Sequence, residues 1–160
     1  MAFHSLNPIN FESVSAVTLT PSVEIGVRRI ENEEEYIYCY NDGGASITAG
    51  FGVILSNVTG YSVTVSSVTE VGGFFGIAKN ATFATAAYGW MMVRGFVDMP
   101  NGMAGTAVAD ADIVVPAVDG KFAAHTSTAK TIPFGVVMSA GASGGTGASL
   151  SMLFVRCLGA

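Results

Sequence analysis

The ten residues from Tyr88 to Val97, YGWMMVRGFV, restrict the fold more than any other stretch and include the only tryptophan of the chain. Side chains alternate across a β-strand, so one face of this run would be apolar except for Arg94 and the other apolar throughout. Two glycines and a run of aromatic and β-branched residues disfavour a helix. The run therefore predicts a central strand buried on both faces, with a bend or bulge at Gly89 and at Gly95.

Strand patterns of this kind recur along the chain every 8 to 12 residues, separated by Gly, Pro, Asn, Asp or Ser. Further strands are predicted at Val23–Ile30, Tyr36–Tyr40, Phe51–Asn57, Tyr61–Thr69, Phe74–Ala78, Thr106–Val108, Ile113–Val115, Phe122–Ala124, Phe134–Met138 and Leu150–Leu158. Asn41-Asp42-Gly43-Gly44 predicts a turn in which glycine supplies positive φ. Residues 79–87 fit either one helical turn or a loop. The pattern indicates an all-β protein, a small sandwich or barrel of short antiparallel strands, with a single β domain over residues 23–160.

Residues 1–22 read differently and predict an extended N-terminal arm. Their apolar side chains recur every two to three positions between Asn, Ser and Pro, which is too irregular for an amphipathic helix. These apolar residues are Phe3, Leu6, Ile9 and Phe11. A partner-binding arm and a first edge strand at Val14–Thr18 fit the segment equally well. An arm of this kind orders only when a partner offsets its lost entropy.

The composition points to a protein that works in an assembly. Half of the residues are apolar and 12% are charged, against roughly 25% in an average soluble domain. No apolar run reaches the roughly 18 residues of a membrane span, and Met1–His4 begins no secretory signal pattern. The surplus apolar surface therefore predicts oligomer or assembly contacts. A net charge of −5 with seven Lys and Arg residues argues against a nucleic-acid partner.

The chain offers few residues for catalysis, and we expect no enzyme, no cofactor and no metal. The run Glu31–Glu35 and the pair Asp110 and Asp112 could bind a cation, but solvated acids are the favoured interpretation. His4 and His125 form no ligand motif, and residues 141–147 lack the ending of a phosphate loop. We expect the two cysteines, Cys39 and Cys157, to be buried thiols rather than a disulfide.

Tyr36, Tyr38 and Tyr40 would share one face of their strand. Such a stripe could stack sugar rings, but cross-strand packing is the favoured interpretation. A carbohydrate-binding β-module, for example a head-fibre or adhesion component, remains the alternative function, with Trp90 as a further platform.

Three stretches carry a family resemblance. They are Glu34–Asn41 leading into Gly43–Gly50, then Tyr88–Gly95, then Asp119-Gly120-Lys121 ahead of Thr131–Val137. Together they cover about residues 34–158, and their order resembles that of phage capsid decoration proteins, also called cement proteins. The resemblance implies a β-rich clamp on a capsid lattice, frequently trimeric and without catalysis.

From the resemblance we expect a structural virion protein, made in the host cytoplasm, that binds the outer surface of an assembled phage head and stabilises the shell. A protein that binds the assembled lattice but not its dissociated subunits shifts the equilibrium toward the lattice. The expected partners are the major capsid protein and further copies of the chain. The expected capsid contacts are Phe3, Leu6, Ile9 and Phe11 of the arm.

Overall fold

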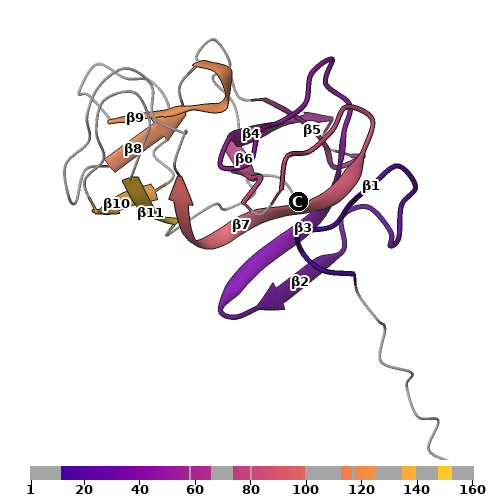
Figure 1. The fold of residues 1–160 in the computed structure, drawn as a ribbon, viewed down its shortest axis with the longest axis horizontal. Helices are drawn as coiled ribbons and strands as arrows, with labels where there is room; N and C mark the ends of the chain where they lie inside the picture. Colours follow the sequence, from indigo (N-terminus) through magenta and orange to yellow (C-terminus); the bar gives the residue numbers. More distant parts are fainter. Residues whose placement is uncertain are drawn as a thin grey trace, which may run out of the picture.

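The structure is a computed structural model that describes residues 12–57, 59–65, 74–79, 81–99, 113–116, 118–124, 135–139 and 148–152. These ranges contain strands and one short 3₁₀ turn but no α-helix, which confirms the predicted all-β class (Figure 1). The strands are β1 (Val17–Thr18), β2 (Arg28–Glu31), β3 (Glu34–Asn41), β4 (Gly52–Asn57), β5 (Ser62–Val65), β6 (Phe74–Ile77), β7 (Tyr88–Met99), β8 (Ile113–Pro116), β9 (Phe122–Ala124), β10 (Gly135–Ser139) and β11 (Ala148–Met152). The 3₁₀ turn η1 spans Val118–Gly120. Nowhere in these ranges is there a helix with the length and apolar character needed to cross a membrane.

Five strands close into a barrel in the order β3, β5, β4, β6 and β7, because β7 pairs back onto β3. All of these pairs are antiparallel except β3 with β5, which is parallel. The predicted antiparallel arrangement therefore holds for every pair of the ring except this one. Directions cannot alternate around a ring with an odd number of strands, so at least one pair of neighbours must run parallel.

β7 is shared between the barrel and a second sheet (Figure 1). Its first part pairs with β3, with Trp90 opposite Tyr38, and its last part pairs with β11, with Gly95 opposite Met152. The change of partner falls at Gly95, whose φ of +135° is a conformation that glycine adopts readily. The predicted bend at Gly95 is therefore confirmed. Beyond β11 the second sheet continues through β10, β8 and β9.

Both faces of β7 are buried within the barrel half, as the sequence predicts. Met91 and Val93 point into the barrel and pack with Ile37 and Cys39 of β3. The rest of the inner cluster comes from residues distributed around the ring, namely Ile47, Val53, Val63, Phe75, Ala78 and Phe83. Trp90 lies on the opposite face and is only 3% exposed. Removing this apolar surface from water is the main driving force for the barrel.

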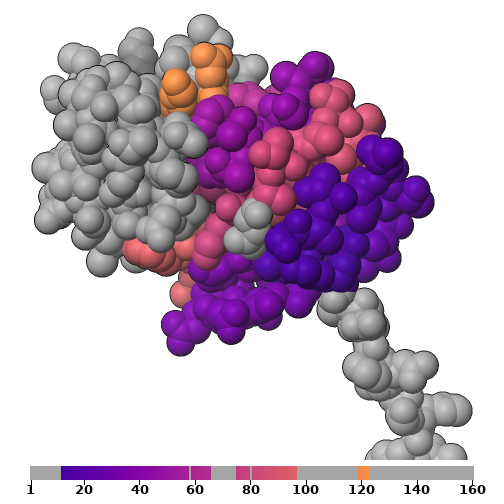
Figure 2. Space-filling view, viewed as in Figure 1, coloured from indigo at the N-terminus to yellow at the C-terminus, as the bar shows by residue number. Residues whose placement is uncertain are grey.

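The N-terminal segment and β2 cover that opposite face. β1 pairs with β7, placing Val17 opposite Gly89, and Ser22 N donates to the Tyr38 hydroxyl at 3.2 Å. Figure 2 shows this indigo segment lying directly against the barrel. The alternative interpretation of Val14–Thr18 as an edge strand agrees with β1, while residues 1–11 fall outside the described ranges.

Gly89 allows this close approach. A Cβ built on it would lie 2.9 Å from Ala16 O and would also meet the Phe83 ring. A glycine within a strand permits close backbone approach, and at Gly89 the approaching backbone is that of the N-terminal segment.

Three local predictions need correction. The strand predicted at Val23–Ile30 begins only at Arg28, because Gly26 has a φ of +89° and packs against the Tyr61 ring. The turn after Asn41 is present, but Gly43 and Gly44 do not have positive φ. Residues 81–87 form a loop whose Phe83 bridges to Ile47, so the helical alternative for this segment is wrong.

Candidate functional site

The tyrosine and tryptophan side chains on the outside of the barrel form a packed layer. The Tyr38 and Trp90 rings meet edge to face with centroids 5.1 Å apart, and the Tyr38 and Tyr88 rings are stacked at 6.4 Å. The Arg29 guanidinium lies 5.8 Å from the centroid of Trp90, a cation–π distance. Tyr38 and Trp90 are both buried. Cross-strand packing is therefore the role of this stripe, and neither ring has a free face on which a sugar could stack.

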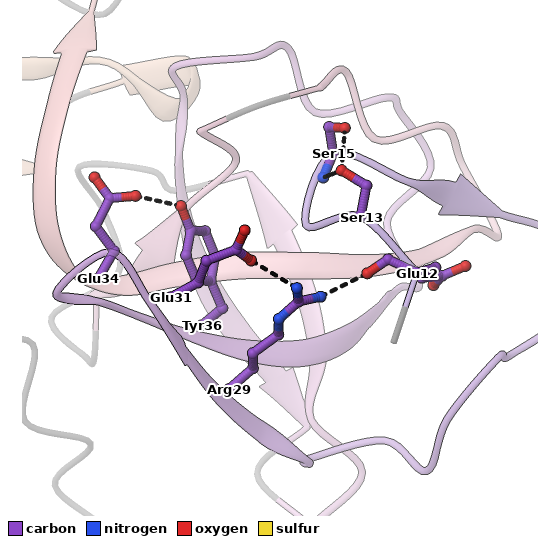
Figure 3. Close-up of polar contacts among 7 residues, drawn as sticks. All are labelled: Glu12, Ser13, Ser15, Arg29, Glu31, Glu34 and Tyr36. Carbon is purple, nitrogen blue, oxygen red and sulfur yellow. Dashed lines mark hydrogen bonds and ion pairs between the residues drawn. The ribbon is translucent and has the colours of Figure 1, made fainter. Parts of the chain in front are cut away.

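Beside this layer lies an open polar groove of about 450 Å³. It runs between the N-terminal segment, the β2–β3 hairpin and the end of β6, and is lined by Ser13, Val14, Ser15, Glu31, Asn32, Glu34, Tyr36 and Lys79. Figure 3 shows Arg29 reaching between two partners at its margin. Its guanidinium donates to Glu12 O at 2.6 Å and pairs with the Glu31 carboxylate at 2.7 Å.

A second network crosses the groove at Glu34. Its carboxylate accepts hydrogen bonds from the Tyr36 hydroxyl and from Lys79 Nζ (Figure 3 shows the former). Lys79 follows β6 and Glu34 begins β3, so this ion pair joins two parts of the ring that are not neighbours in the strand order. The Ser13 and Ser15 hydroxyls bond to each other at 2.8 Å. Among the described residues, the groove therefore holds ion pairs and hydroxyls but no nucleophile paired with a base.

The acidic run does not behave as a solvated, self-repelling loop, and that expectation is wrong. Asn32 and Glu33 form a tight two-residue turn with φ of 51° and 67°, so the acids on either side enter β2 and β3. Each strand acid then meets a base. Glu31 pairs with Arg29, Glu34 with Lys79, and Glu35 with Arg28 at 3.0 Å. Of these pairs, only Arg29 with Glu31 follows from spacing along one strand, whereas the partners of Glu34 and Glu35 are set by how the strands pair.

No group of three metal-ligating side chains occurs in the described ranges. Most of the acids, histidines and loops considered from the sequence lie outside these ranges, namely His4, Asp110, Asp112, His125, residues 141–147 and Cys157. The predicted contacts Phe3, Leu6, Ile9 and Phe11 lie outside them too. Cys39 is buried in the barrel core, where its Sγ contacts Ile37 O at 3.4 Å.

Asn41, which the sequence predicts only as part of a turn, has a structural role in joining two loops. It is the one fully buried polar side chain among the described residues. Its Nδ2 donates toward the carbonyls of Ala45, Phe83 and Ala84 at 3.0–3.2 Å, and its Oδ1 accepts from Gly43 N at 3.1 Å. The side chain therefore joins two loops distant in sequence. The recognisable signal was an Asn directly before a Gly-rich turn, where side-chain-to-backbone bonds are common.

The described surface carries three large exposed hydrophobic side chains. Leu19 and Ile30 are each 77% exposed, and Phe96 is 45% exposed. Single exposed apolar residues are ordinary on protein surfaces. Their positions still matter, because Phe96 follows the bend in β7 and Ile30 lies on the edge strand β2.

Residues 39–153 match the sequence profile of a family described as phage cement protein, which is more than half of the chain. The match runs from within β3 to just past β11, so it includes β4 to β11 in full. β1 and β2 lie before its first residue. No curated protein is similar enough in sequence to be counted as a relative.

Proposed function

The chain belongs to the phage cement protein family, and from this premise we propose that it is a decoration protein that binds the outer surface of an assembled phage head and stabilises the shell. Membership of a structural phage family implies a capsid-associated role in the virion rather than an enzymatic one. The observation that carries the proposal is the match itself, since it spans most of the closed barrel and the second sheet.

The architecture supports this role physically. A closed ring removes the free strand edges that an open sheet would present to other proteins, so the barrel is a rigid unit to attach to a lattice. The proposed partner is the major capsid protein, and we propose that the subunits associate as trimers. The mechanism is mass action: a protein that binds the assembled shell and not its dissociated subunits makes disassembly less favourable.

The arm of residues 1–22 is the proposed capsid contact, with Phe3, Leu6, Ile9 and Phe11 as its anchors. Its described part is fixed at Glu12, whose carbonyl accepts from Arg29 and whose carboxylate accepts from the Ser22 hydroxyl at 2.5 Å. Glu12, the first described residue, is therefore held against the barrel at a defined point. A strand or extended segment added to a neighbouring subunit gains main-chain hydrogen bonds and places alternate side chains in pockets.

The test uses phage heads assembled without the protein. Full-length protein should co-sediment with these heads, and decorated heads should release DNA at a higher temperature than bare heads, as read by a DNA-binding dye. A variant lacking residues 2–11 keeps Glu12 and its bond to Arg29, so it should fold normally but bind the heads more weakly. Failure of the full-length protein to bind heads would refute the decoration role. Equal binding by the two proteins would refute the arm alone.

A further inference from the structure

β2 presents an exposed strand edge at one end of the strand order. β2 stands at the end of the strand order and pairs only with β3 within the described chain. Figure 1 places it at the margin of the molecule, on the side away from β8 and β9. An edge of this kind displays main-chain donors and acceptors to other chains.

The hydrogen-bond pattern shows which residue presents these groups. Tyr38 N donates to Val27 O at 3.0 Å, so Val27 and Tyr38 form a hydrogen-bonded pair. The next pair along the ladder is Arg28 opposite Ile37. Hydrogen-bonded and non-hydrogen-bonded pairs alternate in an antiparallel ladder. Arg29 and Glu31 therefore bond toward β3, whereas the N–H and C=O of Ile30 point outward.

The side chains of β2 are divided in the same way. Arg28 and Ile30 face solvent, with Ile30 77% exposed, while Arg29 and Glu31 are half-buried on the other face. Proteins usually block an edge with a lysine, a proline or a bulge. Here the centre of the edge carries an isoleucine, and the flanking charges on the other face are of opposite sign.

We propose that β2 pairs with β2 of a second copy of this chain, antiparallel and about a two-fold axis at Ile30. This contact is separate from the three-fold contacts of the proposed trimer, so it would join two trimers rather than form one. In this register Ile30 and the partner's Ile30 exchange both main-chain hydrogen bonds, and their side chains lie together on one face. Arg29 then stands opposite the partner's Glu31, and Glu31 opposite the partner's Arg29. Opposite charges directly across an antiparallel pair are stabilising.

The partner is a second copy because one register pairs the outward amide and carbonyl of Ile30 and also covers an exposed apolar side chain. It is favourable for the charges too, because Arg29 and Glu31, which already pair with each other within the chain, each gain an opposite charge from the partner. A parallel arrangement would place Arg29 near the partner's Arg29 and lose the charge match. β2 precedes the matched residues 39–153, so this edge is a feature of this chain and not of the family match.

Disulfide trapping tests the register in full-length protein. Cα atoms of a hydrogen-bonded antiparallel pair lie about 5.5 Å apart, within the roughly 4.4–6.8 Å that a disulfide spans. Under mild oxidation, Ile30→Cys should therefore yield a covalent dimer on a non-reducing gel. Leu19→Cys is the matched control because its side chain is equally exposed at 77%, and the unsubstituted chain controls for the native cysteines. Absence of the dimer, or equal dimer formation by the Leu19 variant, would overturn the proposal.

Sedimentation equilibrium provides a second measurement, made without phage heads, so it can fail while the decoration role stands. Ile30→Lys places two like charges together and should weaken self-association at least tenfold, whereas Leu19→Lys should leave it unchanged. Equal association of the two variants would count against the pairing.

Cross-linking of Ile30→Cys should also persist when residues 2–11 are deleted. Loss of the dimer in that chain would show that the arm of the other copy, rather than its β2, occupies the edge.

Discussion

Replacing Asn41 should destabilise the barrel more than any other single polar substitution at the described positions. The Asn41 side chain is fully buried and contacts three carbonyls and one amide, which belong to the loops after β3 and before β7. The primary amide has only two hydrogens for the three carbonyls, so the four contacts amount to about three complete hydrogen bonds. The same two loops also meet through the Ile47–Phe83 bridge, but that bridge uses backbone hydrogen bonds, which the substitution leaves in place.

The expected cost follows from that count. Each net hydrogen bond contributes roughly 0.5–1.5 kcal/mol, which gives about 3 kcal/mol for Asn41→Ala. The Phe83 carbonyl also accepts from Ile47 N at 2.9 Å, so its second bond limits the loss there. Asn41→Asp keeps the size of the side chain but turns a carboxylate oxygen toward carbonyl oxygens. It should cost at least as much as Asn41→Ala at neutral pH.

Urea unfolding followed by the fluorescence of the single, buried Trp90 measures these differences. The control is Asn57→Ala, since Asn57 is exposed and its Oδ1 accepts only local bonds from Thr59, at 3.0 and 2.8 Å. That change should stay within about 0.5 kcal/mol of the parent. If Asn41→Ala costs no more than Asn57→Ala, the argument that Asn41 joins the two loops is wrong.

Three further predictions concern the packing around β7. Gly89→Ala should lower the stability measured by thermal unfolding by about 1–3 kcal/mol, because the added Cβ would lie 2.9 Å from Ala16 O. The control is Gly44→Ala, whose Cβ would meet nothing within 4 Å and which should be neutral. Lys79→Met leaves the half-buried Glu34 carboxylate without its cation and should lower the free energy of unfolding by about 1–3 kcal/mol. Loss of Arg28, whose side chain is 57% exposed, should lower it by less than about 0.5 kcal/mol. Equal effects of the two changes in urea unfolding would contradict this. Trp90 fluorescence should be weakly quenched by acrylamide and unchanged by soluble glycans; strong quenching would show the indole to be exposed.

The local alternation of side chains made much of the barrel predictable. The run around Trp90 was correctly interpreted as a strand buried on both faces, and Gly95 as the site of a bend, because period-two patterns and glycines act over a few residues. The order of features also sufficed to identify the family. Closure of the ring was not predictable in this way, because the parallel pairing of β3 with β5 depends on contacts distant in sequence.

The polar contacts were the least predictable part. The partners of Glu34 and Asn41 are Lys79, which is 45 residues away, and the Phe83 and Ala84 carbonyls, 42 and 43 residues away. No spacing rule connects residues so far apart until the strand register is known. The acidic run was misinterpreted partly for the same reason, because the bases that pair with Glu34 and Glu35 lie on other parts of the barrel. The pair of Glu31 with Arg29 is different, since the two residues lie two positions apart on β2.

The position of β7 in the ring has a consequence for the order of events during synthesis. β7 is the last barrel strand along the chain, and it pairs with β1, β3 and β6, all of which precede it. Until residues 88–99 have left the ribosome, the edges of β3 and β6 stay open, and pairings of this long range are slow to form. A nascent chain of this protein therefore has an incomplete sheet, whose unpaired strand edges can pair with other chains, for much of its translation. Premature termination before Tyr88 should yield insoluble fragments, whereas chains that extend past Met99 have every strand that the ring requires.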